Sequence, residues 1–437
     1  MLNNIKNHKF NNNYFIKTIF NIFPLIMLVP SGYITAYSTF FIIYSCIFLF
    51  INKIKIKIFF SDYLIFIFFL SSIISTIISY SNSNFIILAK SISDIRFALL
   101  FLLIRNLFFY KIIRINTLLT LSFACAIFLS LDILLQFIYG KDILGYTIID
   151  GRYGGVFGEE AIAGGYIQKF SMLAILASCY FKFKNNQKKK WLIFFTIILL
   201  GTGILMTLDR APFFIYILSL FLLLILLKTY RIIIFYSLII IILFFSIMYK
   251  NNNLVQHRYG PIYSNVKIII LEITNLIIKE KKSNEYPFSI QEKTMQTGIE
   301  YFKLFNSAIY TFKNNFWIGS GSKSFYKSCN ELIKYNKDLL CAPHPHNIYL
   351  EILINQGIIG IVIFFIFLLS ILKKYYLYFI APKKLNFEKI LMLSFFIIFI
   401  VELWPLRSYG SIFQTVNGTL FWFLISLASS KLLVNKN

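Results

Sequence analysis

The chain has 437 residues, of which 58% are hydrophobic and only 14% are charged. The apolar residues fall in long uninterrupted runs instead of the amphipathic stripes of soluble helices, which excludes a soluble globular fold. The formal net charge of +25 would fit a nucleic-acid partner, but most lysines lie in short clusters between the apolar runs, where basic residues orient membrane helices. We therefore predict a polytopic membrane protein that binds membrane lipids and no nucleic acid.

The apolar runs predict about twelve membrane-spanning helices, because roughly 20 mostly apolar residues cross the hydrocarbon core. The first run follows a polar, basic stretch and has no small-residue cleavage site after it, so we expect it to be retained as a first span. The predicted spans are residues 14–30, 33–51, 61–80, 86–104, 117–139, 164–182, 191–208, 212–228, 232–249, 347–372, 390–404 and 411–431.

The basic clusters favour one orientation of these spans. With the N-terminus in the cytoplasm, every lysine-rich loop falls on the same side, and the alternating loops carry few lysines, as the positive-inside rule requires. The inner loops are residues 52–57, 105–114, 182–190, 228–231 and 373–389. We expect both termini to be cytoplasmic.

One predicted outer loop, residues 250–346, is far longer than the others. Loops of this length escape the charge rule and are usually functional. Its apolar run at 266–278 is too short to span and predicts a helix on the membrane surface, and residues 291–313 predict a second short helix. The fold class is therefore an all-α integral membrane protein. An N-terminal bundle of about nine spans (1–249) precedes the loop, and about three C-terminal spans (347–437) follow it.

Only eight residues are arginine, and four of them fall in predicted outer segments: Arg152, Arg210, Arg258 and Arg407. Because arginine suits bidentate contact with phosphate oxygens, their placement suggests an anionic ligand at the outer face. The alternative is that each side chain snorkels to the lipid headgroups. For Arg258 and Arg407 both interpretations stay open. We favour ligand contact for Arg152, in the glycine-rich segment 151–165, and for Arg210, in a very short turn between two spans.

The start of the span at 347–372 carries the sharpest pattern. His346 and Asn347 are followed by nine residues and then by Gly357 and Gly360. Histidine exchanges a proton near neutral pH, which a general base requires, and the two glycines would let the helix pack closely against a neighbouring helix. Zinc binding by His344 and His346 is the alternative, but few further ligands lie nearby in the sequence, and we expect no metal site.

This histidine pattern resembles the His-Asn, nine residues, Gly-x-x-Gly motif of the O-antigen ligase and O-antigen polymerase superfamily. Three further features are similar to that family: the glycine segment with Arg152, the turn with Arg210, and residues 316–325 (FWIGSGSKSF), which resemble the glycine motif of its long periplasmic loop. The resemblance covers most of the chain in architecture.

The resemblance implies a metal-independent, inverting glycosyltransferase of the bacterial inner membrane that needs no cofactor and has its active site facing the periplasm. Its donor would be a glycan on undecaprenyl diphosphate, and its acceptor would be lipid A core or another glycan. By position, Arg152 and Arg210 would bind the diphosphate and stabilise the charge that grows on the leaving group. His346 would activate or orient the acceptor hydroxyl. The candidates for supporting roles are Asn347, Glu160, Arg258, Arg407 and His344, with the Glu160 carboxylate as a competitor for the base.

Three functions follow from this reading: a ligase that joins the glycan to lipid A core, a polymerase that extends the glycan on its lipid carrier, and a flippase for lipid-linked sugar. The large one-sided loop and the outer position of His346 favour an enzyme over a transporter. The resemblance does not separate ligases from polymerases.

Two pairs of residues remain open at this point. Cys329 and Cys341 lie in the outer loop, where an oxidising periplasm would allow a disulfide if their Cα atoms approach within roughly 7 Å. Arg96 and Asp132 lie in neighbouring predicted spans, where charges are costly unless they are paired or functional. We expect these two to pair with each other, the alternative being that Arg96 reaches the lipid diphosphate.

Overall fold

The computed structural model describes residues 13–79, 85–160, 162–183, 185–261, 296–334, 339–380 and 387–430. These residues form α-helices joined by loops and two short 3-10 turns, and they contain no β-strand beyond two isolated bridges. The predicted surface helix at 266–278 lies outside the described residues.

Helices stand at each of the predicted spans, and six runs of the described residues are long and apolar enough to cross a membrane. The six are α3 (Ser31–Ile51), α4 (Phe60–Ser79), α7 (Asn116–Tyr139), α9 (Asn186–Met206), Lys228–Asn251, which contains α11 (Arg231–Asn251), and α15 (Ile348–Ile380). The chain is thus a multi-pass membrane protein, and the count of about twelve spans stays a prediction.

Shorter helices fill the other predicted spans: α8 (Ala163–Tyr180), α10 (Arg210–Leu226), α16 (Phe387–Glu402) and α17 (Thr415–Ser430). Two predicted spans are broken. The run at 14–30 forms α1 (Asn13–Asn21) and α2 (Phe23–Ile26), and the run at 86–104 forms α5 (Phe85–Ser93) and α6 (Ile95–Phe109).

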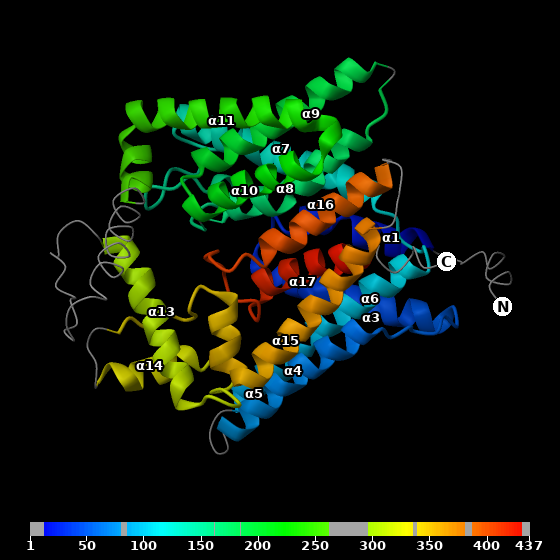
Figure 1. The fold of residues 1–437 in the computed structure, drawn as a ribbon, viewed down its shortest axis with the longest axis vertical. Helices are drawn as coiled ribbons and strands as arrows, with labels where there is room; N and C mark the ends of the chain where they lie inside the picture. The colour runs from blue at the N-terminus through cyan, green and yellow to red at the C-terminus, as the bar shows by residue number, and fades with distance from the viewer. Residues whose placement is uncertain are drawn as a thin grey trace.

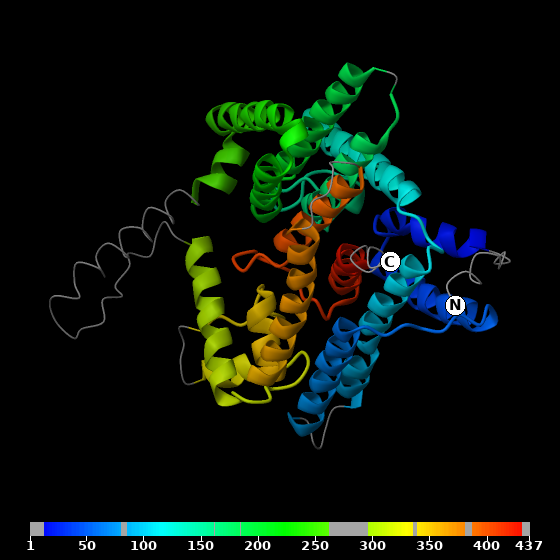
Figure 2. The same cartoon turned by 45° about the vertical axis from the view of Figure 1, so that its right-hand side comes forward.

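The helices form two groups that α16 and α17 join (Figures 1 and 2). Helices α7 to α11 pack together as one group, and α3, α4, α5, α6 and α15 form the other. Because α16 packs on α8 and α10 while α17 packs on α3 and α6, the segment between these two helices lies at the junction of the groups.

The connecting segments gather at two ends, in agreement with the lysine pattern. At one end the amide of Lys57 donates to Asn106 (2.8 Å), so two predicted inner loops lie together. At the other end the Arg258 guanidinium donates to the Gly151 carbonyl (3.2 Å), and the Tyr409 amide donates to the His346 carbonyl (2.9 Å). The predicted outer segments therefore meet each other.

A kink in α15 explains the glycine motif at 316–325. Gly357 has φ +65° inside the helix, and a Cβ there would lie 2.4 Å from the Trp317 carbonyl oxygen. The freed helix groups bond to the motif: Ser320 donates to Ile354 (2.7 Å) and Gly321 to Asn355 (3.1 Å). The close approach predicted for Gly357 is thus to a loop, not to a neighbouring helix. Gly360 instead makes room for the Gln356 side chain of its own helix.

Helices α13 (Gln296–Asn314) and α14 (Phe325–Ile333) lie beside the start of α15 (Figure 1). A small apolar cluster holds them there, and it includes Leu304, Ala308 and Ile354. A disulfide joins Cys329 to Cys341, with the two Cα atoms 5.7 Å apart. The disulfide links α14 to the loop segment that leads into His346.

The expected pair between Arg96 and Asp132 is wrong. Both oxygens of the Asp132 carboxylate accept backbone amides, from Ile143 (2.9 Å) and Val156 (3.0 Å). Arg96 instead donates to the Thr415 hydroxyl (3.0 Å). Asp132 is buried because loop amides satisfy it, and it needs no cation.

Candidate functional site

Three of the four predicted outer arginines surround one carboxylate. Arg152 lies 3.4 Å from Asp209, and Arg210 begins the helix that follows Asp209. Burial raises the pKa of Asp209 to about 6, while the charges of Arg152, Arg258 and Arg210 act to lower it. Among the described residues, the exposed Asp150 adds a second negative charge near Arg258. The cluster therefore carries an excess of positive charge at the predicted outer end.

The glycine segment fixes Arg152 in this cluster. Gly155 has φ +53°, and a Cβ there would lie 2.7 Å from an Asp132 carboxylate oxygen, so only glycine fits without a shift. Its amide donates to Gln136 (2.9 Å), and the amide of Tyr153 donates to the Thr207 carbonyl (3.3 Å). The segment just after Arg152 is thus anchored to α7 and to the end of α9.

His346 is held by the segment between α16 and α17. It adopts φ +53°, an uncommon conformation for a residue with a side chain, and its carbonyl accepts the Tyr409 amide. Burial lowers the pKa of His346, and a hydrogen bond with the Tyr409 backbone acts to raise it. A bond that favours the protonated ring is one that the ring donates, so the acceptor is the Tyr409 carbonyl. In the neutral ring the other nitrogen then carries the lone pair that a general base needs.

A buried polar network makes that segment rigid. Arg407 donates to Glu402 (2.9 Å) and to Gln168 (2.7 Å), and the Tyr409 hydroxyl donates to the second Glu402 oxygen (2.7 Å). Arg407 is only 8% exposed, so the snorkelling interpretation is wrong for it. Its guanidinium holds the segment that contacts His346.

Asn347 has a supporting position of the same kind. Its side-chain oxygen accepts the amides of Tyr349 (3.0 Å) and Leu350 (3.2 Å), which caps the start of α15, and its amide group donates to the Pro405 carbonyl (2.7 Å). The residue after His346 therefore anchors the helix start to the segment between α16 and α17.

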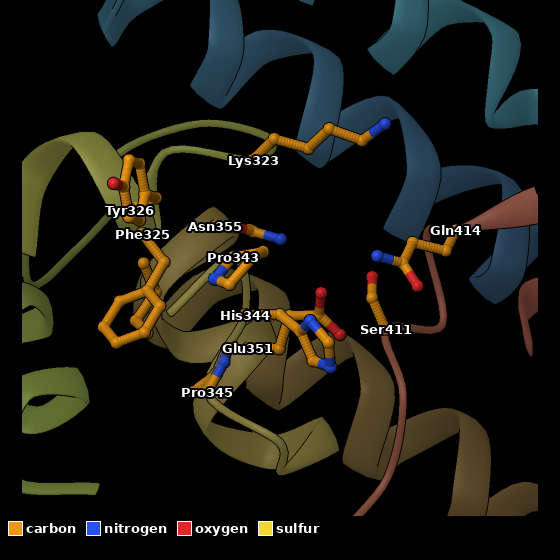
Figure 3. A pocket seen from close by; sticks show the side chains of 11 residues that line it. Lys323, Phe325, Tyr326, Pro343, His344, Pro345, Glu351, Asn355, Ser411 and Gln414 are labelled. Atoms are coloured by element: carbon orange, nitrogen blue, oxygen red, sulfur yellow. The ribbon is translucent and has the colours of Figure 1, made fainter. Parts of the chain in front are cut away.

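Two cavities are lined by neighbours of His346, although His346 itself lines neither. The larger, about 310 Å³, includes the neighbouring His344 and Pro345 in its lining. Figure 3 shows the polar side chains that point toward it: Lys323, His344, Glu351, Asn355, Ser411 and Gln414. The smaller, about 110 Å³, is lined by Tyr409, which contacts His346, and by Ala211 and Pro212, which follow Arg210. The polar pocket thus involves residues just before His346 in the chain, and the second cavity involves its contact Tyr409 and the residues that follow Arg210.

The structure does not unite every predicted residue with this site. Glu160 is exposed, and none of the interactions found among the described residues joins its side chain to His346. The His344 ring lies 4.2 Å from the His346 ring, and burial, with the charge of His346, lowers the pKa of His344 to about 4. Within the described ranges no group of three or more metal-binding side chains occurs.

Four site residues were missed by sequence reasoning: Lys169, Lys323, Glu351 and Gln414. For Lys169 a signal existed, because it is an ionisable residue inside the predicted span 164–182, and such residues are rarely without a role. The same signal existed for Glu351 in the predicted span 347–372, and Lys323 lies in the glycine motif 316–325, whereas Gln414 reaches the pocket only through the fold.

The fold and this site define a class: a multi-pass helical membrane protein with clustered cations and a histidine where its helices end. The O-antigen ligase family model matches residues 170–365, which include Arg210, Arg258 and His346 and leave out Arg152 and Arg407. The match confirms the resemblance to the O-antigen ligase and polymerase superfamily, and it supports a function of that general type. Comparison with curated proteins gives no match.

Proposed function

We propose that this chain is an O-antigen ligase-like glycosyltransferase, which moves a glycan from undecaprenyl diphosphate to lipid A core or another acceptor at the periplasmic face of the bacterial inner membrane. The observation that carries the proposal is that neighbours of His346 line both a polar pocket and a cavity that Ala211 and Pro212, next to Arg210, also line.

The arginine cluster is the proposed diphosphate site. Arg152, Arg210 and Arg258 outnumber the carboxylates near them, and guanidinium groups bind phosphate oxygens in pairs. Negative charge grows on the diphosphate as the sugar departs, and fixed cations stabilise that charge most in the transition state. Because the arginines supply this positive charge, the proposed reaction uses no metal ion and no cofactor.

His346 is the proposed base. Its lone-pair nitrogen takes the proton of an acceptor hydroxyl held in the larger pocket, and the acceptor oxygen forms a bond to the anomeric carbon of the donor sugar. The bond from that carbon to the diphosphate oxygen breaks on the opposite face, which inverts the configuration and releases undecaprenyl diphosphate. The polar lining of the pocket, including Glu351, Ser411 and Gln414, suits the hydroxyl groups of a sugar.

A polymerase would use the same donor site and base and differ in its acceptor, which would be a second lipid-linked glycan. A flippase is less well supported, because the large one-sided loop and the predicted outer position of His346 favour an enzyme. In either enzyme the loop 250–346, Arg152 and Arg210 face the periplasm and both termini face the cytoplasm, as the lysine pattern favours.

Deletion of the gene, followed by electrophoresis of the surface glycans, tests the proposal. We expect full-length glycan polymer to accumulate without attachment to its acceptor. Attachment of single repeats without polymer would identify a polymerase, and donor trapped on the cytoplasmic side would identify a flippase. Normal surface glycans would contradict all three functions.

A further inference from the structure

Lys169 is a buried cation that the proposed mechanism does not use. It lies on α8 with 7% of its surface exposed, and it lines the smaller cavity together with Gly165, one turn earlier on the same helix face. Its ammonium lies 4.5 Å from the centre of the Tyr409 ring. Within the described residues it forms no ion pair and no hydrogen bond of its own.

The charges around Lys169 do not balance. The charged groups that act on it are Glu402 and Arg407. Both oxygens of the Glu402 carboxylate already have partners, because one accepts a hydrogen bond from Arg407 and the other accepts one from the Tyr409 hydroxyl. Two buried cations thus share one carboxylate, and the surplus positive charge borders a cavity. A buried charge without a partner is costly, so this cavity favours an anion.

The opposite wall of the cavity favours an anion as well. Ala211 and Pro212 line it from the first turn of α10, a helix of 17 residues whose N-terminal Asp209 makes no side-chain cap. The first turn of a helix carries partial positive charge and unpaired amides. On the facing helix, a Cβ at Gly165 would meet nothing within 4 Å, so the space there is open.

We propose that Lys169 is a phosphate-contacting residue of the donor site, on the membrane side of the arginine cluster. The inference rests on the proposed function. The ammonium donates hydrogen bonds to an oxygen of the lipid diphosphate and stays protonated throughout, so it transfers no proton. Arg210, at the start of α10, then reaches the diphosphate from the outer side, while Lys169 reaches it from within the bundle.

The test measures binding of undecaprenyl diphosphate and undecaprenyl monophosphate to the full chain in lipid nanodiscs, without any transfer reaction. Lys169→Met keeps the length and burial of the side chain and removes its charge. We expect it to bind the diphosphate roughly 10- to 100-fold more weakly than the wild type, the size of a lost hydrogen bond to a charged group. Lys169→Arg should retain most of the affinity. Lys141→Met, at an exposed lysine of a predicted outer segment, is the matched control and should bind like the wild type.

The outcomes separate the two claims. A wild-type chain that binds neither lipid overturns the proposed function, and this inference with it. Wild-type binding that Lys169→Met leaves unchanged overturns the inference alone, and so does a loss in Lys169→Arg as large as in Lys169→Met. If Lys169→Met does not fold, Gly165→Leu fills the same cavity without touching a charge. Diphosphate binding that survives this filling places the ligand elsewhere and overturns the inference.

Discussion

Two clusters of buried charges lie at opposite predicted ends of this molecule, and they differ in the number of cations for each carboxylate. At the predicted inner end, Arg105 pairs with Asp62, and both side chains are 0% exposed. The Ser61 hydroxyl accepts from Arg105 (2.8 Å), and the nearby Lys374 is partly exposed. Among the described residues of that end, the fully buried cation Arg105 has its own carboxylate, and neither of the two cavities described above includes it in its lining.

At the predicted outer end, cations exceed carboxylates twice, around Asp209 and around Glu402, and each excess lies beside a cavity. A matched pair satisfies itself and holds helices together, whereas a surplus cation next to open space needs an anion from outside. We infer that charge balance, more than burial, separates the structural arginine at the inner end from the proposed ligand-binding arginines and lysine at the outer end. It predicts that changes at the outer end reduce transfer and that changes at the inner end reduce stability.

The largest effect is expected at His346. His346→Gln removes the base and should lower glycan transfer in proteoliposomes by at least about 100-fold, the usual contribution of a positioned base. Thermal unfolding in detergent should not change. Glu160→Gln, at the exposed competitor for the base, is the control and should transfer normally. Near-normal transfer by the His346 variant would contradict the proposed role of His346 as the base.

At the inner end, Arg105→Met should destabilise the chain by about 3–5 kcal/mol, because it leaves Asp62 charged and buried without a partner. Chemical unfolding in detergent measures the loss, and the transfer rate per folded molecule should stay at the wild-type level. Arg114→Met, at an exposed arginine of the same end, should have no effect on stability. The double variant Arg105→Met/Asp62→Leu should recover most of the loss, and failure to recover would show that the pair is not the cause.

The disulfide offers a smaller effect on stability at the outer end. Replacing Cys329 and Cys341 by alanine should cost at most about 3 kcal/mol, the chain-entropy estimate for a loop of this size. Thiol titration of the denatured, unreduced protein gives an independent check. We expect the three thiols of Cys46, Cys125 and Cys179, and five free thiols would rule the bond out.

The smallest effect concerns the charge of Asp209. Its pKa is raised to about 6, so the carboxylate is ionised at pH 7 and becomes neutral as the pH falls through about 6. Loss of that negative charge makes the arginine cluster more positive and should tighten diphosphate binding. The ratio of affinities between Asp209→Asn and the wild type should therefore be roughly two- to fivefold at pH 7.5 and approach one near pH 5. A ratio that does not change with pH would contradict the role of the Asp209 charge. Because both proteins bind the same lipid, any titration of the lipid phosphate affects both affinities equally and does not change the ratio.

The sequence by itself determined the membrane class, the positions of the helices and the polar ends that carry the chemistry. Apolar runs and lysine clusters are recognisable without tertiary contacts. The thickness of the membrane sets the length of an apolar span, and lysines collect in the inner loops. The histidine motif and Arg210 were recognisable for a similar reason, since each stands in a short, distinctive segment. The broken helices at α2 and α5 were missed because a run of apolar residues does not reveal where its backbone bends.

Only the tertiary structure decided which charges face one another. Arg96 and Asp132 are close in sequence and were expected to pair, yet loop amides satisfy Asp132, and Arg96 meets Thr415 from the far end of the chain. The sequence left Arg407 open between ligand contact and snorkelling, and the fold pairs it with Glu402. Lys169 became a candidate ligand only once that carboxylate was seen to be fully occupied. The partners of a buried or partly buried cation range from five residues away, as for Arg407 and Glu402, to 319 residues away, as for Arg96 and Thr415, and the sequence does not show which of them the fold brings close.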